Sequence, residues 1–395
     1  MSKCKGILLI AFYFLLFVSM GFKNDIDEIK NSLYYSSLEY PSYVEFLKRN
    51  SLYVFISSVL IGFILVVNLY LINLKITSNK YSFLLFFITI LFCIRSFFVD
   101  YSFGFKIFQS ILMYLSVFLV ISKINYKYGM VENNKFFLLS LNIFSIFYSS
   151  VCFVSYLSGY GFVEGNVRYF GVTIHPNYMG VNMAICSFIL LYNLVVLGFK
   201  YNIPFLLCSL YLLLLTGSRN SLILFSISLL FLCIFNRNLL MKFFSFIFIV
   251  IFSSYLYLIK NSDQFDRGSG GPNTRAEAWV NMMDMIEKKP LLGLGYFQGD
   301  SENSYMRVAI AFGLPMALLF VFLIISLIYF YNKHKKIDIS NLGLLGFCLL
   351  LGMSSSAFFE GYLMDLWSLP KILFLMLIFL AVKRSSPLIR SNKAV

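Results

Sequence analysis

The sequence is poor in charged residues, and this scarcity excludes most classes of soluble protein. Asp, Glu, Lys and Arg make up only 13% of the 395 residues, whereas soluble domains are about a quarter charged. Hydrophobic residues make up 59%, and the mean hydropathy is +0.81. A chain of this composition would not stay dispersed in water, so we expect an integral membrane protein.

The chain also has few of the residues and motifs that hold metals or phosphates. His175 and His334 are its two histidines, which argues against a histidine-based zinc site. The seven cysteines form no Cys-x-x-Cys pair and are expected to be packing residues. No Walker pattern follows the glycine-containing stretch 268–272, and no internal repeat of the kind found in many transporters is visible. We therefore expect no metal site and no cofactor.

What is abundant is apolar sequence in segments long enough to cross a bilayer, which takes about 20 residues each. These segments predict an all-α, polytopic membrane protein with about twelve spans, forming a single integral membrane domain over residues 1–395. The first segment lacks a small-residue cleavage site and is interpreted as an uncleaved span. The expected spans are 6–23, 51–74, 81–99, 102–122, 136–157, 177–198, 203–217, 219–235, 239–260, 305–331, 340–356 and 366–382.

The distribution of charge predicts the orientation of these spans. With the N-terminus inside, the inner segments hold about half of the 32 basic residues, as the positive-inside rule requires. Only Glu132 and Asp338 of the 18 acidic residues lie on that side. The net charge of +14 is therefore interpreted as a topology signal, and nucleic-acid binding is not expected. Both termini are expected in the cytoplasm, and the large polar loop 261–303, between spans nine and ten, outside.

This loop is expected to contain an amphipathic helix. Thr274 and Glu277 fit a capping box, and the helix should run to about Lys289 and stop before Pro290. It could lie on the bilayer or over a cavity. Its apolar face is predicted to consist of Trp279, Val280, Met283 and Ile286.

Charged residues at both ends of the loop are candidates for function. Arg275 lies in the first helical turn, where a cation is disfavoured by the helix dipole unless an anionic ligand joins the site. Glu302 directly precedes the tenth span, and Arg307 lies in that span's first turn. Ionisable residues at this depth are costly. The alternative is that Glu302 and Arg307 pair with each other or sit at the wet interface.

Two shorter outer loops carry further candidates. Pro176 suits a helix start, and Asn177 can cap near it. Arg219 lies at the start of a span, where backbone N–H groups point at anions. Taken singly, Arg168 and Arg219 can be cations that reach the bilayer surface, and His175 a packed loop residue.

Together, these motifs resemble the bacterial family of O-antigen polymerases and O-antigen ligases over residues 165–330. The resemblance is carried by Arg168-x-x-Gly171 with Pro176-Asn177, by Ser218-Arg219, and by Arg275-x-x-x-Trp279 followed by Pro290-Leu-Leu-Gly-Leu-Gly295. Ligases of this family carry a His-x-Ser-x-x-x-Gly pattern in the loop. Here the matching stretch reads Glu302-Asn303-Ser304, with Val308 in place of the glycine. This departure favours a polymerase.

The resemblance implies a metal-independent glycosyltransferase of the bacterial inner membrane, with an oligosaccharide on undecaprenyl pyrophosphate as substrate. Arginines would neutralise the pyrophosphate leaving group through bidentate contacts. Glu302 is the first choice for the base that accepts the proton of the acceptor hydroxyl, and His175 is the second, with Glu277 or Glu360 next. A chain-length regulator protein is a further partner that the resemblance allows. The substrate-binding candidates are Arg168, Asn177, Arg219, Arg275, Trp279, Asn303, Tyr305 and Arg307.

Two other functions stay open at this stage. An O-antigen ligase would transfer the glycan to lipid A-core. A twelve-span transporter or lipid-linked-sugar flippase would also have both termini inside, but it is expected to place charged residues near the middle of the membrane. Most charged residues of this chain instead cluster at the outer rim.

Overall fold

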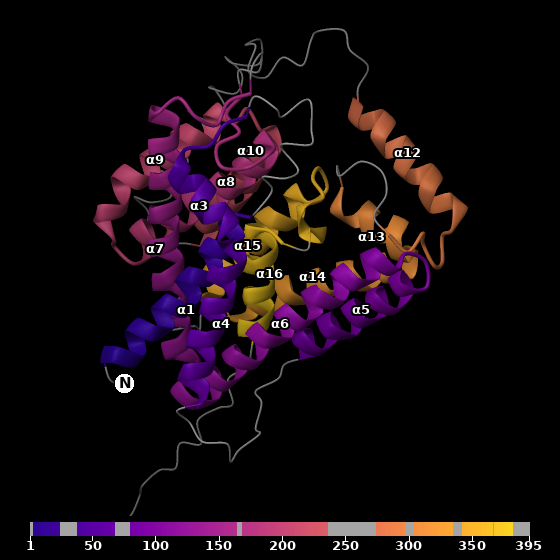
Figure 1. Cartoon of the computed structure of the whole chain (residues 1–395), viewed down its shortest axis with the longest axis horizontal. Coiled ribbons are helices and arrows are strands. Elements are labelled where there is room, and N and C mark those ends of the chain that lie inside the picture. The colour runs from indigo at the N-terminus through magenta and orange to yellow at the C-terminus, as the bar shows by residue number, and fades with distance from the viewer. Residues whose placement is uncertain are drawn as a thin grey trace, which may run out of the picture.

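The structure, a computed structural model, is a bundle of helices (Figure 1). It describes residues 3–23, 38–67, 80–163, 168–235, 274–296, 303–334, 342–365 and 367–381, which contain no β-strand. In chain order the elements are α1 (Lys3–Gly21), α3 (Ser42–Arg49), α4 (Ser51–Val67), α5 (Lys80–Phe97), α6 (Tyr101–Tyr128), α7 (Met130–Leu157), α8 (Pro176–Val196), η1 (Lys200–Asn202), α9 (Ile203–Leu215), α10 (Arg219–Phe235), α12 (Thr274–Lys288), α13 (Ser304–Phe312), α14 (Leu314–His334), α15 (Leu342–Ser356), η2 (Tyr362–Met364) and α16 (Leu369–Leu380).

These helices are those of a multi-pass membrane protein. Each expected span overlaps an apolar helix, except 239–260, which lies outside the described residues. By length and composition, six described helices can cross a bilayer, or seven if α3 and α4, bent by 56°, form one span. Other apolar helices are shorter, so the total of twelve spans stays a prediction. The shorter helices are Lys200–Leu215, Arg219–Phe235, Leu342–Ser356 and Leu369–Leu380.

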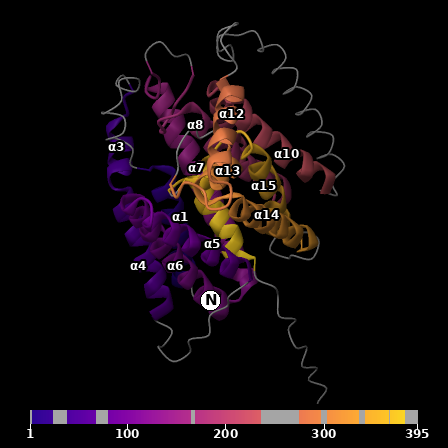
Figure 2. The ribbon, with the colours of Figure 1, turned by 90° about the vertical axis from the view of Figure 1, so that its right-hand side faces the viewer.

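The short helix α16 lies at the centre of the bundle (Figure 1). All of its residues are buried, and it contacts α1, α5, α6, α8 and α15. Around it, α1 packs against α4 and α7, and α10 packs against α8 and α15. Figure 2 shows α12 and α13 one above the other, with α14 and α15 beside α13. Because neighbouring helices cover α16 on all sides, its apolar residues are buried against protein.

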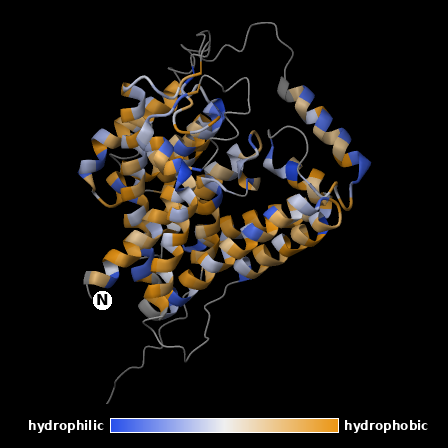
Figure 3. Ribbon diagram, in the orientation of Figure 1, coloured by the Kyte–Doolittle hydropathy of each residue, from blue (hydrophilic) through white to orange (hydrophobic). Residues whose placement is uncertain are grey.

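The outer surface of the bundle is apolar, as lipid contact requires. Figure 3 shows hydrophobic residues along α5, α6 and α14, and a mixed pattern on α12. Phe83 on α5 is 74% exposed and Leu318 on α14 is 70% exposed. Large exposed apolar patches are rare on soluble monomers and mark interaction surfaces. These helices therefore present the surface that faces the acyl chains.

The predicted span 305–331 is wrong as a single helix, because the chain breaks between α13 and α14. Gly313 has φ +87°, and a Cβ atom there would collide with the carbonyl oxygen of Leu291. Leu314 N–H donates to Pro290 O at 2.8 Å, so the backbone of 290–292 fits into the break. Pro315, in the first turn of α14, is compatible with a helix start and would disrupt a continuous helix.

The loop helix α12 has the predicted position, and protein covers part of its surface. It begins at Thr274 and ends at Lys288, before Pro290. Ala278 and Met282 are buried, whereas Val280 and Met283 are 59% and 56% exposed. Protein therefore covers only part of the predicted apolar face, through the contact of α12 with α13. Val280 and Met283 stay exposed, and their predicted contact with the bilayer stays a prediction.

The break at Gly313 makes a testable contribution to stability. Gly313 and Gly129 share nearly the same backbone conformation, with φ +87° and +80°, a region that only glycine occupies readily. A Cβ atom at Gly129 would meet nothing within 4 Å. We expect Gly313→Ala to lower the thermal unfolding temperature in detergent more than Gly129→Ala, by the equivalent of about 1–3 kcal/mol for overpacking. Equal decreases would show that the contact with Leu291 is unimportant.

Candidate functional site

Arg168 is held at the junction of two helix ends. Its Nε donates to Thr216 O at 2.8 Å, and its Nη2 donates to Asn177 Oδ1 at 2.7 Å. The next residue, Tyr169, donates its N–H to Leu215 O at 3.0 Å. Arg168 thus joins the α9–α10 turn to the start of α8, which fixes the plane of its guanidinium group.

Asn177 also forms a hydrogen bond with a carboxylate. Its Nδ2 donates to Glu360 Oε1 at 2.5 Å. Glu360 lies in the segment between α15 and η2 and is only 5% exposed. A buried carboxylate needs hydrogen bonds or a nearby positive charge. The guanidinium, amide and carboxylate therefore form one chain of hydrogen bonds from Arg168 to Glu360, and we call these three residues the Arg168 relay.

His175, and not Asn177, caps helix α8. The Asn177 N–H donates to His175 Nδ1 at 3.2 Å. The prediction that Asn177 acts as the cap is therefore wrong, although Pro176 begins the helix as predicted. When Nδ1 accepts a hydrogen bond, the proton of a neutral imidazole is on Nε2. His175 would have to give up its capping bond before Nδ1 could accept a proton, which weakens it as the candidate base.

The start of α13 lies beside the Glu360 segment. Ser304 Oγ donates to Glu360 O at 2.7 Å, and Ser304 N–H donates to Ala357 O at 2.9 Å. Asn303 caps α13 by accepting from the N–H groups of residues 305 and 306. Tyr305 donates its hydroxyl to Ser354 O at 2.8 Å. Asn303 and Tyr305 therefore have structural contacts, and Glu302, which precedes them in sequence, lies outside the described residues.

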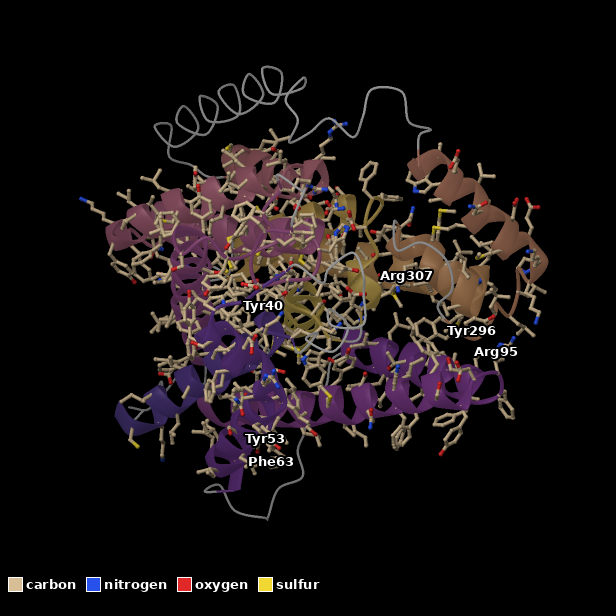
Figure 4. The ribbon with its side chains drawn as sticks, turned by 45° about the horizontal axis from the view of Figure 1, so that its top comes forward. Tyr40, Tyr53, Phe63, Arg95, Tyr296 and Arg307 are labelled. Carbon is tan, nitrogen blue, oxygen red and sulfur yellow. The ribbon has the colours of Figure 1, made fainter. Side chains whose placement is uncertain are left out.

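Arg307 pairs with an acid that the sequence did not single out. Its Nη1 is 3.4 Å from Asp365 Oδ1 and 3.1 Å from Gly361 O. Figure 4 marks Arg307 near the segment that joins α15 to α16. Burial raises the pKa of Asp365, and the positive charges of Arg307 and Lys23 partly oppose this shift. Arg307 thus holds this segment in place.

The other predicted residues, Arg219, Arg275 and Trp279, lie on α10 and α12. Arg219 is exposed at the first position of α10, directly after the turn whose Thr216 carbonyl accepts a hydrogen bond from Arg168. Arg275 lies in the first turn of α12, and its side chain is not described. One turn further on, the ring of Trp279 stacks on Phe359 with centroids 6.3 Å apart, next to Glu360. The structure therefore places α12 beside the Glu360 segment.

Two buried polar groups near the relay lack partners among the described residues. Both amide atoms of Asn220 are buried without a hydrogen bond, and so is Nε1 of Trp279. Buried polar groups are normally bonded, and each exception calls for an explanation such as a ligand or a water molecule. Asn220 directly follows Arg219. One of these unpartnered groups therefore lies beside the α9–α10 turn, and the other lies on the loop helix.

Glu360, Asp365 and Asn220 are the main residues that the sequence-based search ranked too low or missed. Glu360 and Asp365 are acids in a short stretch between two apolar helices. This position in the sequence could have marked them as candidates. Their partners lie far away in sequence: Asn177 and Glu360 are 183 residues apart. No group of three His, Cys, Asp or Glu residues that could hold a metal ion occurs within the described part of the chain.

Comparison with known families gives one match. A family model described as O-Antigen ligase matches residues 204–321, a stretch that includes Thr216, Arg219, Trp279 and Arg307. The match supports a relation to the O-antigen polymerase and ligase family and does not separate the two activities. A search of curated proteins finds no match.

Proposed function

We propose that this protein is a membrane glycosyltransferase that joins undecaprenyl-pyrophosphate-linked oligosaccharide repeat units at the outer face of the inner membrane, as an O-antigen polymerase. The relay carries this proposal. It places an arginine, an amide and a carboxylate at the meeting point of α8, the α9–α10 turn and the Glu360 segment. The family match covers the α9–α10 turn and the loop helix α12.

The chemistry requires a site for a doubly charged leaving group and a proton acceptor. An acceptor hydroxyl attacks the anomeric carbon of the growing chain, the bond from this carbon to the pyrophosphate oxygen breaks, and the pyrophosphate leaves on its lipid. Arg168, Arg219 and Arg275 neutralise this group, since guanidinium forms bidentate contacts with phosphate. The hydroxyl proton passes to Glu302. Trp279 on the loop helix covers the saccharide.

The choice of polymerase over ligase rests on the start of α13. The ligase pattern has a histidine two residues before the serine, and this chain has Glu302 two residues before Ser304. A ligase is the second candidate because the matching family model carries that description. In a ligase the same arginines would bind the leaving group, and lipid A-core would be the acceptor.

A deletion strain tests the proposed function. We expect it to make lipopolysaccharide capped with a single repeat unit, because ligation continues while polymerisation stops. Free lipid-linked polymer would instead indicate a ligase. The purified protein should also lengthen lipid-linked glycans in detergent, without a sealed membrane. Activity that appears only in sealed vesicles would point to a transporter and contradict the proposal.

A further inference from the structure

A pocket lies next to the relay, between the end of α1, the segment 172–174, the start of α8 and the segment 365–370. Its wall combines aromatic rings with polar side chains. None of the ten candidate site residues lines it. The residues that matter here are Lys23, Thr173, Tyr178, Asn182, Asp365 and Trp367.

Two aromatic rings of this pocket are held in place by neighbouring rings. Trp367 packs against Phe55 of α4, with centroids 5.2 Å apart and planes at 60°. Tyr178 lies edge-on to His175, with centroids 5.9 Å apart. Rings fixed in this way offer rigid apolar surface at a low entropic cost to a ligand.

The polar groups of the pocket are also held in position. Asp365 is paired with Arg307 at 3.4 Å, and the Tyr178 hydroxyl bonds to its carboxylate. Asn182 donates through Nδ2 to Tyr148 Oη at 2.9 Å, which orients its amide. Lys48, which is fully buried, donates to Val172 O at 2.6 Å and secures the backbone on that side.

This combination of groups fits one chemical class of ligand. A sugar ring has an apolar face that stacks on aromatic side chains and hydroxyls that need both donors and acceptors. Asp365 supplies an acceptor and Lys23 a donor. Thr173 supplies a hydroxyl group, and Asn182 supplies an amide. Because Lys23 and Arg307 balance the charge of the Asp365 carboxylate, the wall suits a neutral ring with hydroxyl groups.

The pocket adjoins the relay through consecutive residues. Tyr178 follows Asn177 in α8, and Asp365 directly follows η2, the short helix that comes after Glu360. We infer that this pocket binds a neutral sugar ring of the acceptor glycan beside the relay, an inference that rests on the proposed function. The pocket would thereby select the acceptor, and the arginines would bind the donor pyrophosphate.

The two tryptophans of the chain allow a direct test. In the full-length Trp279→Phe variant, purified in detergent, Trp367 is the remaining tryptophan and its fluorescence reports on the pocket. We expect a saturable change with free neutral saccharides such as galactose or N-acetylglucosamine, and none with inorganic pyrophosphate. Asp365→Asn and Tyr178→Phe, made in this background, should each weaken binding about fivefold, the effect of one lost hydrogen bond. Glu45→Gln, an exposed acid outside the pocket, should leave binding unchanged.

Several outcomes would overturn the inference. These are no response to any neutral saccharide, a response to glucuronic acid alone, or equal affinity in Asp365→Asn, Tyr178→Phe and the parent. Thermal unfolding of each variant is measured in parallel. Because Tyr178→Phe keeps its aromatic ring, it still tests the pocket if Asp365→Asn does not fold. Lengthening of lipid-linked glycan by the wild type separates the two proposals. Active protein without a saccharide response overturns the pocket alone, and saccharide binding without transferase activity overturns the proposed function alone.

Discussion

Replacing Arg168 with alanine is expected to reduce glycan lengthening by at least about 100-fold, the size of effect seen when one donor to a developing negative charge is removed. The guanidinium neutralises the leaving pyrophosphate in the proposed mechanism, and it also holds Asn177 Oδ1 and Thr216 O. Arg168→Lys keeps the charge but cannot form both contacts, so we expect it to restore little activity. The measurement is turnover of lipid-linked repeat units by purified protein.

Arg95 is a matched control for this experiment. It also makes two hydrogen bonds through Nε and Nη2, to Leu292 O and Gly293 O at 3.0 Å. It lies in the last turn of α5, and Figure 4 shows it away from Arg307. Arg95→Ala should cost similar stability while keeping most of the turnover. Similar losses of turnover in Arg95→Ala and Arg168→Ala would mean that Arg168 acts only by holding loops together.

Replacing Glu302 with glutamine is expected to lower turnover by at least about tenfold, because general-base catalysis contributes about 10²–10⁴-fold. The substitution keeps the shape of the side chain and removes its basicity. Binding of the lipid-linked donor should be largely kept. Turnover and donor binding are therefore measured on the same preparation. Unchanged turnover would remove Glu302 from the mechanism.

His175→Asn sharpens this test, because asparagine is a good N-cap and has no imidazole. If His175 serves mainly as the cap of α8, the variant should keep its turnover and stability, whereas His175→Ala should lose about 1 kcal/mol of stability. An inactive His175→Asn with a fully active Glu302→Gln would assign the base to His175. Full turnover in both variants would direct attention to Glu360, which already bonds to Asn177.

Hydropathy and local motifs predicted the helices well because both are short-range signals. The turn at 216–218 separates α9 from α10, and α12 stops before Pro290, as expected. The break at Gly313 was missed although Gly313 and Pro315 stand in the sequence. Apolar residues continue on both sides, and the backbone of Leu291 that fills the break comes from a distant segment.

The candidate site could be predicted only in part, for the same reason. Asn177 and Arg219 were singled out because each lies at a helix start, and Arg168 because it belongs to a loop motif before α8. Glu360 was ranked last among the bases, and Asp365 was not singled out, because hydropathy cannot tell which helix ends meet. Asn303 and Tyr305 were chosen for their place in a motif, and their observed contacts are with the backbone.

The long sequence separation within the relay has a consequence for how the protein is made. Asn177 and Glu360 are 183 residues apart, and synthesis proceeds at about 5–20 residues per second, so Glu360 is added roughly 10 to 40 s after Asn177. During that interval the first half of the chain carries Arg168 and Asn177 without the carboxylate that completes their contacts. The nascent chain therefore cannot assemble the relay, which forms only when Glu360 and the C-terminal helices join the bundle.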